Sequence, residues 1–191
     1  GGVDENKTKL IKMIEDAANG GLYLITDLLD VHEIEENKST HLETVEINAI
    51  FNRINSTFKG LAQAKEIKLI FQTDQSLVVH SNTDYLTRIL DNLVSNAVKF
   101  SKRGSVVEIT AVNTDTDFRL SVKDNGPGFT EQDKSFVFQK FRRLSARPTG
   151  GESSNGLGLA IVKTLVDRLK GEILLESEVG KGSVFTIILK K

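Results

Sequence analysis

The residues with the clearest chemical potential lie in the stretch LDNLVSNAVKFS, which runs from Leu90 to Ser101. At helical spacing, Asn92, Asn96 and Lys99 fall on one stripe, and apolar side chains surround the rest of the helix. Asparagine is a middling helix former, so two of them one turn apart in an apolar helix need a reason. Amide oxygens can bind Mg²⁺ that is also held by phosphates. The alternative is a polar stripe satisfied by neighbouring backbone groups.

A second stretch, VKDNGPGF at positions 122–129, combines a carboxylate with two glycines. Asp124, at the end of an expected strand, can accept a hydrogen bond from an exocyclic amine. Gly126 and Gly128 allow the backbone to turn sharply and to approach a flat base that a Cβ atom would obstruct. The same residue types also form ordinary turns, which is the alternative interpretation.

A third stretch, NGLGLAIVK at positions 155–163, places Gly156 and Gly158 just before an expected helix. Free N–H groups and the helix dipole at such a helix start suit a phosphate. The stretch is not a Walker loop, because it lacks a glycine-lysine-serine/threonine run. Taken alone, it could equally be the tight start of a structural helix.

In their order and spacing, the three stretches resemble the ATP-binding domain of sensor histidine kinases. This domain belongs to the superfamily that also holds gyrase, MutL and the large heat-shock chaperone ATPases. The stretches match its N box and its first and second glycine boxes. FVFQKFRR at positions 136–143 matches its phenylalanine-rich box, and GKGSVFTI at positions 180–187 matches its third glycine motif. The resemblance covers the chain from about Leu42 to Lys191.

The resemblance implies that the ligands are ATP and Mg²⁺. It makes Asn96 the metal ligand, with Asn92 one turn before it on the same face, and it directs Lys99 toward phosphate. It makes Asp124 the acceptor of a hydrogen bond from the adenine amino group. The other implied nucleotide contacts are Phe100, where many relatives carry tyrosine, Gly126, Gly128, Lys140, Arg142, Arg143, Gly156, Leu157, Gly158, Leu159 and Thr186. For Arg142 and Arg143, a solvated basic patch is the alternative.

The residue type at the position of Asn92 distinguishes the branches of this superfamily. Gyrase-like and chaperone ATPases carry a glutamate at the corresponding position, where it acts as the general base that activates water. An asparagine cannot accept a proton at neutral pH, so fast ATP hydrolysis is disfavoured. Phosphoryl transfer to an acceptor depends mainly on positioning and charge neutralisation, so it does not require this base.

Hydrophobic periodicity and turn signals predict the elements that must position these residues. The pattern predicts a long helix over residues 7–38. For the rest of the chain, the resemblance implies an α/β two-layer sandwich of the Bergerat ATP-binding type, with a mixed, mostly antiparallel sheet and helices on one face. The expected strands are 42–47, 68–73, 77–80, 106–113, 117–124, 172–177 and 183–189, and the expected helices are 49–65, 83–100 and 158–169. Between Asp124 and Gly158 the regular pattern fails, which is typical of a lid or binding loop.

The N-terminal segment carries a heptad seam, interrupted by Gly20 and Gly21, that favours a partner helix. The alternative is an ordinary amphipathic helix that packs on its own domain. We therefore divide the chain into residues 1–38, part of a dimerisation hairpin, and residues 39–191, the ATP-binding catalytic domain. The run LYLITDLLDVHEIEENK resembles the second helix of the histidine kinase hairpin, whose first helix carries the phosphoacceptor histidine. His32 precedes Glu33 as an acceptor would, but it lies on this second helix. We expect this chain to label weakly or not at all with ATP.

Composition excludes several classes of protein. A formal net charge of −1, from 25 basic and 26 acidic residues, disfavours a nucleic-acid partner. No apolar run approaches the roughly 20 residues of a membrane helix, so we expect a soluble segment without membrane contact. We expect it to be cytoplasmic, whether or not the parent protein is anchored in a membrane. The absence of cysteine fits a reducing compartment.

The function implied by the resemblance is transfer of the ATP γ-phosphate to a histidine, with relay to a response-regulator receiver domain by a protein that dimerises through the hairpin. The alternatives are a protein-serine kinase of the anti-sigma or dehydrogenase-kinase kind, and a non-catalytic nucleotide-sensing module.

Overall fold

A computed structural model describes residues 7, 8, 10, 11, 14, 18, 21, 22, 25, 41–74, 76–142, 144–149 and 156–191. Most of the expected helix over residues 7–38 lies outside the described residues, as do His32, Arg143 and the boundary near residue 38. Within the part of the chain that is described, no helix combines the length and the apolar character needed to cross a membrane.

From residue 41 onward, the elements follow the expected order. They are β1 (Glu43–Glu46), α2 (Ile47–Ala64), β2 (Lys68–Gln72), β3 (Val78–Ser81), α3 (Thr83–Phe100), β4 (Val106–Asn113), β5 (Asp117–Asp124), α4 (Glu131–Lys134), α5 (Gly158–Arg168), β6 (Glu172–Glu178) and β7 (Gly182–Lys190). The bounds of α3 agree with the expected range of 83–100. The short helix α4 lies in the region where no regular element was expected.

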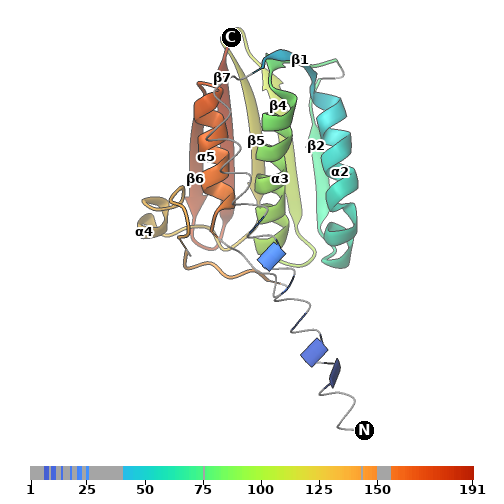
Figure 1. Ribbon diagram of the computed structural model, residues 1–191, viewed down its shortest axis with the longest axis vertical. Coiled ribbons are helices and arrows are strands. Elements are labelled where there is room, and N and C mark those ends of the chain that lie inside the picture. The colour runs from blue at the N-terminus through green and yellow to red at the C-terminus, as the bar shows by residue number, and fades with distance from the viewer. Residues whose placement is uncertain are drawn as a thin grey trace.

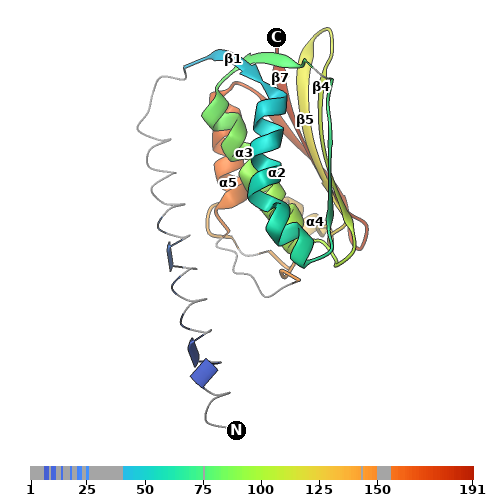
Figure 2. The ribbon, with the colours of Figure 1, turned by 90° about the vertical axis from the view of Figure 1, so that its right-hand side faces the viewer.

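Five strands form one sheet in the order β2, β4, β5, β7, β6, which places β5 at its centre. The pair β2–β4 is parallel, and the other pairs are antiparallel. Helices α2, α3 and α5 lie side by side on one face of this sheet, with α3 in the middle (Figures 1 and 2). The expected two-layer sandwich is therefore confirmed. A detail that was not expected is that β1 and β3 pair as a separate antiparallel ribbon.

The core lies between the helices and the inner face of the sheet. Alternate residues of β5 and β7 are buried there, including Leu120, Val122, Phe185 and Ile187. Helix α3 buries apolar side chains along most of its length; these are Leu86, Ile89, Leu90, Leu93, Val94, Ala97 and Val98. Its polar stripe is only half-buried. The helix is thus held firmly by its apolar side chains while Asn92 and Asn96 stay accessible.

Both ends of α3 are fixed by side chains. At the start, Asn82 Oδ1 accepts a hydrogen bond of 2.8 Å from the Tyr85 N–H, which confirms the expected cap. At the end, the Lys65 ammonium group donates to the Val98 and Lys99 carbonyls, both at 2.8 Å. A cation at the C-terminus of a helix is favourable because the last carbonyl groups carry partial negative charge.

Candidate nucleotide-binding site

The polar stripe of α3 meets the first residue of α5. A Cβ atom at Gly158 would lie 2.7 Å from Asn92 Oδ1 and 3.8 Å from Asn96 Nδ2. The Asn92 amide nitrogen donates to the Arg88 carbonyl at 2.9 Å, which turns its oxygen toward α5. A Cβ atom at 158 would therefore displace the Asn92 side chain, whereas it would make only an ordinary van der Waals contact with Asn96.

The N-terminus of α5 is suited to an anion. Its first turn contains no acidic residue, so no side chain of its own neutralises the positive end of the helix dipole. Leu157 is buried just before the helix, and Leu159 packs against the core, so the start of α5 is held in place. Gly156 has φ of 69° and lies against the Arg142 carbonyl, 2.6 Å from where a Cβ atom would be.

The loop after β5 folds back on its own carboxylate. The Gly126 N–H donates to Asp124 Oδ1 at 2.7 Å, and a Cβ atom at 126 would lie 3.3 Å from the Phe100 carbonyl. Gly128 has φ of 68°, and a Cβ atom there would lie 2.1 Å from the Glu178 carbonyl. The loop is therefore confined between the end of α3 and the turn between β6 and β7.

Ser177 joins this loop to the β6–β7 hairpin. Its hydroxyl accepts a hydrogen bond from the Phe129 N–H at 2.9 Å and donates to the Gly182 carbonyl at 2.8 Å. It also lies 3.1 Å from the Ser183 hydroxyl. Sequence reasoning missed Ser177 and Ser183, because a serine in a strand gives no signal of its own.

Burial raises the pKa of Asp124 from 3.8 to about 6, while hydrogen bonds from the backbone of Gly126 and Ser183 lower it. The carboxylate is thus ionised at neutral pH but poorly hydrated. A ligand that donates a hydrogen bond to it replaces the missing water, and an exocyclic amine is such a donor. The contact of Asp124 with an adenine amino group stays a prediction, which the burial of this carboxylate favours.

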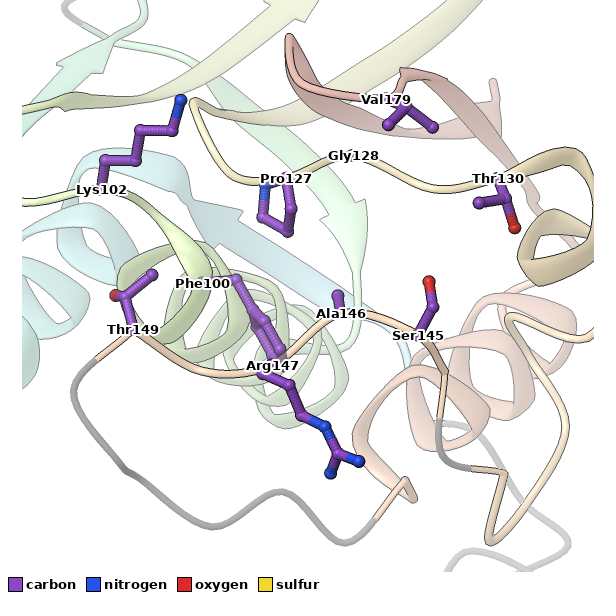
Figure 3. Close-up of a pocket in the computed structure, with 10 residues that line it drawn as sticks. All are labelled: Phe100, Lys102, Pro127, Gly128, Thr130, Ser145, Ala146, Arg147, Thr149 and Val179. Carbon is purple, nitrogen blue, oxygen red and sulfur yellow. The ribbon is translucent and has the colours of Figure 1, made fainter.

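A cavity of about 280 Å³ lies between the loop after β5 and a later segment, residues 144–149 (Figure 3). Of the predicted residues, it is lined by Phe100 and Gly128. Eight further residues also line it, and sequence reasoning did not select them; they are Lys102, Pro127, Thr130, Ser145, Ala146, Arg147, Thr149 and Val179. The expectation of a lid in this region would have drawn attention to residues 145–149, whereas Val179 is brought in only by the hairpin.

Some predicted residues are placed elsewhere. Thr186 alternates with the buried residues Phe185 and Ile187, so it faces the side of the sheet that turns away from the helices. This orientation argues against its assignment as a nucleotide contact, which stays a prediction. Ser183, which pairs with Asp124 across β5 and β7, is the buried residue of this strand at the site.

Of the two predicted arginines, only Arg142 is described, and it is not among the residues that line the cavity. Arg142 lies over the ring of Phe136, 4.5 Å from its centroid, and is exposed, as is Lys140. Phe138 packs against the core. Phe141 is 59% exposed.

The residues present fit Mg²⁺ only when phosphate oxygens complete the coordination. Among the described residues, no group of three or more His, Cys, Asp or Glu side chains could hold a metal ion. Mg²⁺ prefers oxygen ligands and is usually held by one or two protein groups together with substrate phosphates and water. The Asn96 amide, next to a helix start that suits phosphate, provides such a donor set.

Comparison with known proteins gives consistent matches. The family described as histidine kinase-, DNA gyrase B- and HSP90-like ATPase matches residues 81–191. The sensor protein GacS of Pseudomonas syringae pv. syringae is 35% identical over 93% of this chain and 20% of its own length. The hybrid signal transduction histidine kinase L of Dictyostelium discoideum is 30% identical over 98% of this chain and 12% of its own length.

A solved structure, full-length ShkA in complex with AMPPNP, aligns with a TM-score of 0.75 and 27% identity over 91% of this chain and 36% of that one. The chain spans only 12% to 32% of the length of such curated relatives. The matched family, the fold and the convergence of the three sequence stretches agree. The chain belongs to the histidine kinase-, DNA gyrase B- and HSP90-like ATPase family, and it contains an ATP-binding catalytic domain of the sensor histidine kinase type.

Proposed function

We propose that this chain binds ATP with Mg²⁺ and transfers the γ-phosphate to a histidine side chain of the protein to which it belongs. The proposal depends on one observation: Asn92 and Asn96 of α3 approach Gly158 at the start of α5. Phe100, at the end of α3, lines the cavity. The names of the curated relatives, histidine kinases and sensor proteins, support the same reaction.

In this proposal, each element acts on a different part of the nucleotide. Asp124 accepts a hydrogen bond from the adenine amino group, and Phe100 lines the base cavity. The N–H groups at the start of α5 hold the phosphates. Asn96 holds Mg²⁺, which when bound neutralises phosphate charge. Asn92 contributes an amide oxygen but no base, so it favours transfer to an incoming acceptor over hydrolysis.

The proposed partners are a response-regulator receiver domain, which takes the phosphate, and a second copy of the protein, which pairs through the N-terminal segment. Leu10 and Ile14 support the second proposal: these residues of the heptad seam are 60% and 62% exposed. Apolar side chains at these positions gain from burial against a partner helix. We place the segment in the cytoplasm, where ATP and receiver domains are available.

Replacing Asn96 with alanine should remove the metal-dependent part of ATP binding. In the unchanged protein, Mg²⁺ should strengthen ATP binding, and Asn96→Ala should reduce affinity in Mg²⁺ by at least about tenfold. With EDTA present, the two proteins should bind ATP about equally. Calorimetric titration measures both affinities, and Asn113→Ala, at the exposed end of β4, is the control. Unchanged Mg²⁺ dependence in Asn96→Ala would remove Asn96 from the metal site.

The reaction itself is tested by the chemistry of the product. The full-length natural protein, incubated with γ-labelled ATP and Mg²⁺, should acquire label that is lost in acid and kept in alkali, as expected of phosphohistidine. The Asn96→Ala variant of the same protein should stay unlabelled. Acid-stable label would instead indicate a serine kinase. Tight ATP binding without any label would indicate a nucleotide-sensing module.

A further inference from the structure

Residues 144–149, here called the lid segment, are attached to the domain at both ends. At the first end, the Ser145 backbone N–H donates to Asp133 Oδ1 at 3.1 Å, and the Ser145 hydroxyl donates to Asp133 Oδ2. Asp133 is buried and also accepts from the Thr130 hydroxyl at 2.9 Å. Because Thr130 caps α4, this attachment ties the lid segment to the start of that helix.

The second attachment uses Thr149. Its N–H donates to the Lys99 carbonyl at 3.0 Å, and its hydroxyl lies 2.8 Å from the Ser101 carbonyl and 3.1 Å from that of Lys99. These carbonyls lie at the C-terminus of α3, where a helix has no partners of its own for them. The Lys99 carbonyl also accepts from Lys65 at 2.8 Å. The lid segment is therefore joined to a helix end that is itself fixed.

The attachments place the lid segment opposite the loop after β5. Between them, Ala146 and Arg147 line the cavity, and the backbone of the lid segment lies across it from Pro127 and Gly128 (Figure 3). Phe100 lines the same cavity from the end of α3, directly beside the carbonyls that Thr149 contacts. Thr149 thus sets the spacing between two walls of the cavity, one from α3 and one from the lid segment.

We propose that Thr149 is a positioning residue for the nucleotide: it holds the lid segment as a preformed wall of the base cavity. This inference rests on the proposed function, because it assumes that the base occupies this cavity. A wall that is already in place spares the nucleotide the entropic penalty of ordering it. Without the hydroxyl, the lid segment leaves this position for part of the time, and affinity falls in proportion to the fraction of protein with the wall formed.

The lining of the cavity includes Phe100 and Gly128 but neither Asp124, the two asparagines nor the start of α5. A base held in it therefore lies apart from the proposed phosphate contacts. Loss of the Thr149 hydroxyl should therefore weaken ATP and ADP by the same factor and leave the effect of Mg²⁺ unchanged. A general loss of structure would instead lower the midpoint of unfolding of the nucleotide-free protein. These readouts separate a positioning role from a merely structural one.

The test compares Thr149→Val, which keeps the shape of the side chain but not its hydroxyl, with Thr149→Ser, which keeps the hydroxyl. Exposed Thr57 on α2, whose hydroxyl donates to the Arg53 carbonyl at 3.1 Å, provides the matched control Thr57→Val. Titration with ATP and ADP should show about tenfold weaker binding for Thr149→Val, and Thr149→Ser should bind within about twofold of the unchanged protein. Thr57→Val should bind normally, with the same midpoint of unfolding as Thr149→Val.

If Thr149→Val binds both nucleotides as tightly as the unchanged protein, Thr149 has no positioning role. Tighter binding would also overturn the inference, because it would show that the lid segment obstructs the cavity. A loss confined to ATP would move the role of Thr149 to the phosphates. If the unchanged protein does not bind ATP, both the proposed function and this inference are overturned. That result differs from one in which the unchanged protein binds ATP and Thr149→Val binds it equally well, which overturns this inference alone.

Discussion

Asp124→Asn is expected to weaken ATP binding by at least about tenfold while making the nucleotide-free protein more stable. Asp124 Oδ1 already accepts from the Gly126 N–H at 2.7 Å. An asparagine that keeps this bond presents its NH₂ group to the adenine amine, so two donors face each other. The change has nearly the same shape as the original residue, so it alters hydrogen bonding without removing packing. Titration calorimetry with ATP measures the loss.

The gain in stability follows from the pKa of Asp124, which burial raises from 3.8 to about 6. A carboxyl group with a raised pKa contributes to folding below its unfolded-state pKa, and this contribution is lost as pH rises through about 6. At neutral pH the unchanged protein therefore carries a buried, poorly solvated charge that Asp124→Asn lacks. From the size of the pKa change, we expect the variant to be more stable by on the order of 2 kcal/mol at pH 8.

Chemical denaturation at pH 8 and at pH 4.5 measures this effect. The difference between the two proteins should be largest at pH 8 and should shrink at pH 4.5, where Asp124 is mostly protonated. The ratio of the ATP affinity of the unchanged protein to that of Asp124→Asn should also decrease at pH values below about 6. Taking the ratio removes the effect of phosphate titration, which is the same for both proteins. A pH-independent ratio would mean that the carboxylate does not contact the nucleotide.

Gly128→Ala should destabilise the protein by more than about 3 kcal/mol and remove ATP binding. Its φ of 68° disfavours any residue with a Cβ atom, and that atom would lie 2.1 Å from the Glu178 carbonyl. The backbone of the loop or of the hairpin must move to relieve this contact. Because Gly128 lines the cavity, the movement also displaces one of its walls. Urea denaturation and ATP titration measure the two effects.

Gly180→Ala is the matched control for this change. Gly180 has φ of 83°, and a Cβ atom there would meet nothing within 4 Å. It lies in the turn between β6 and β7, two residues after Glu178, and its N–H donates to the Pro127 carbonyl at 2.7 Å, a bond that alanine keeps. We expect a loss of only about 1 kcal/mol and unchanged affinity. Equal losses in the two variants would show that the strain of a positive φ, and not the contact with Glu178, governs the effect at Gly128.

Local patterns in the sequence were sufficient for the elements and for much of the site. The bounds of α3 follow from its apolar periodicity and its Asn82 cap, both of which act within a few residues. Asp124 and its glycines form a loop whose hydrogen bond joins residues two positions apart. Gly158 could be predicted as a phosphate contact because glycine just before an expected helix is a recognisable local pattern. Such features are encoded locally, so a single stretch of sequence reveals them.

The remaining parts of the site depend on contacts between residues that are far apart in the chain. Ser177 forms a hydrogen bond with Phe129 in the loop after β5, and Thr149 forms hydrogen bonds with carbonyls at the end of α3. The hydrophobic periodicity of the sequence does not predict such hydrogen bonds. The face on which Thr186 lies was decided by the pairing of β7 with β5, because a shift of one residue reverses every side chain of a strand. The sequence by itself therefore determined the nucleotide-binding motifs and the order of the elements. Only the tertiary structure decided which polar side chains complete the cavity, because packing brings together groups that local sequence does not relate.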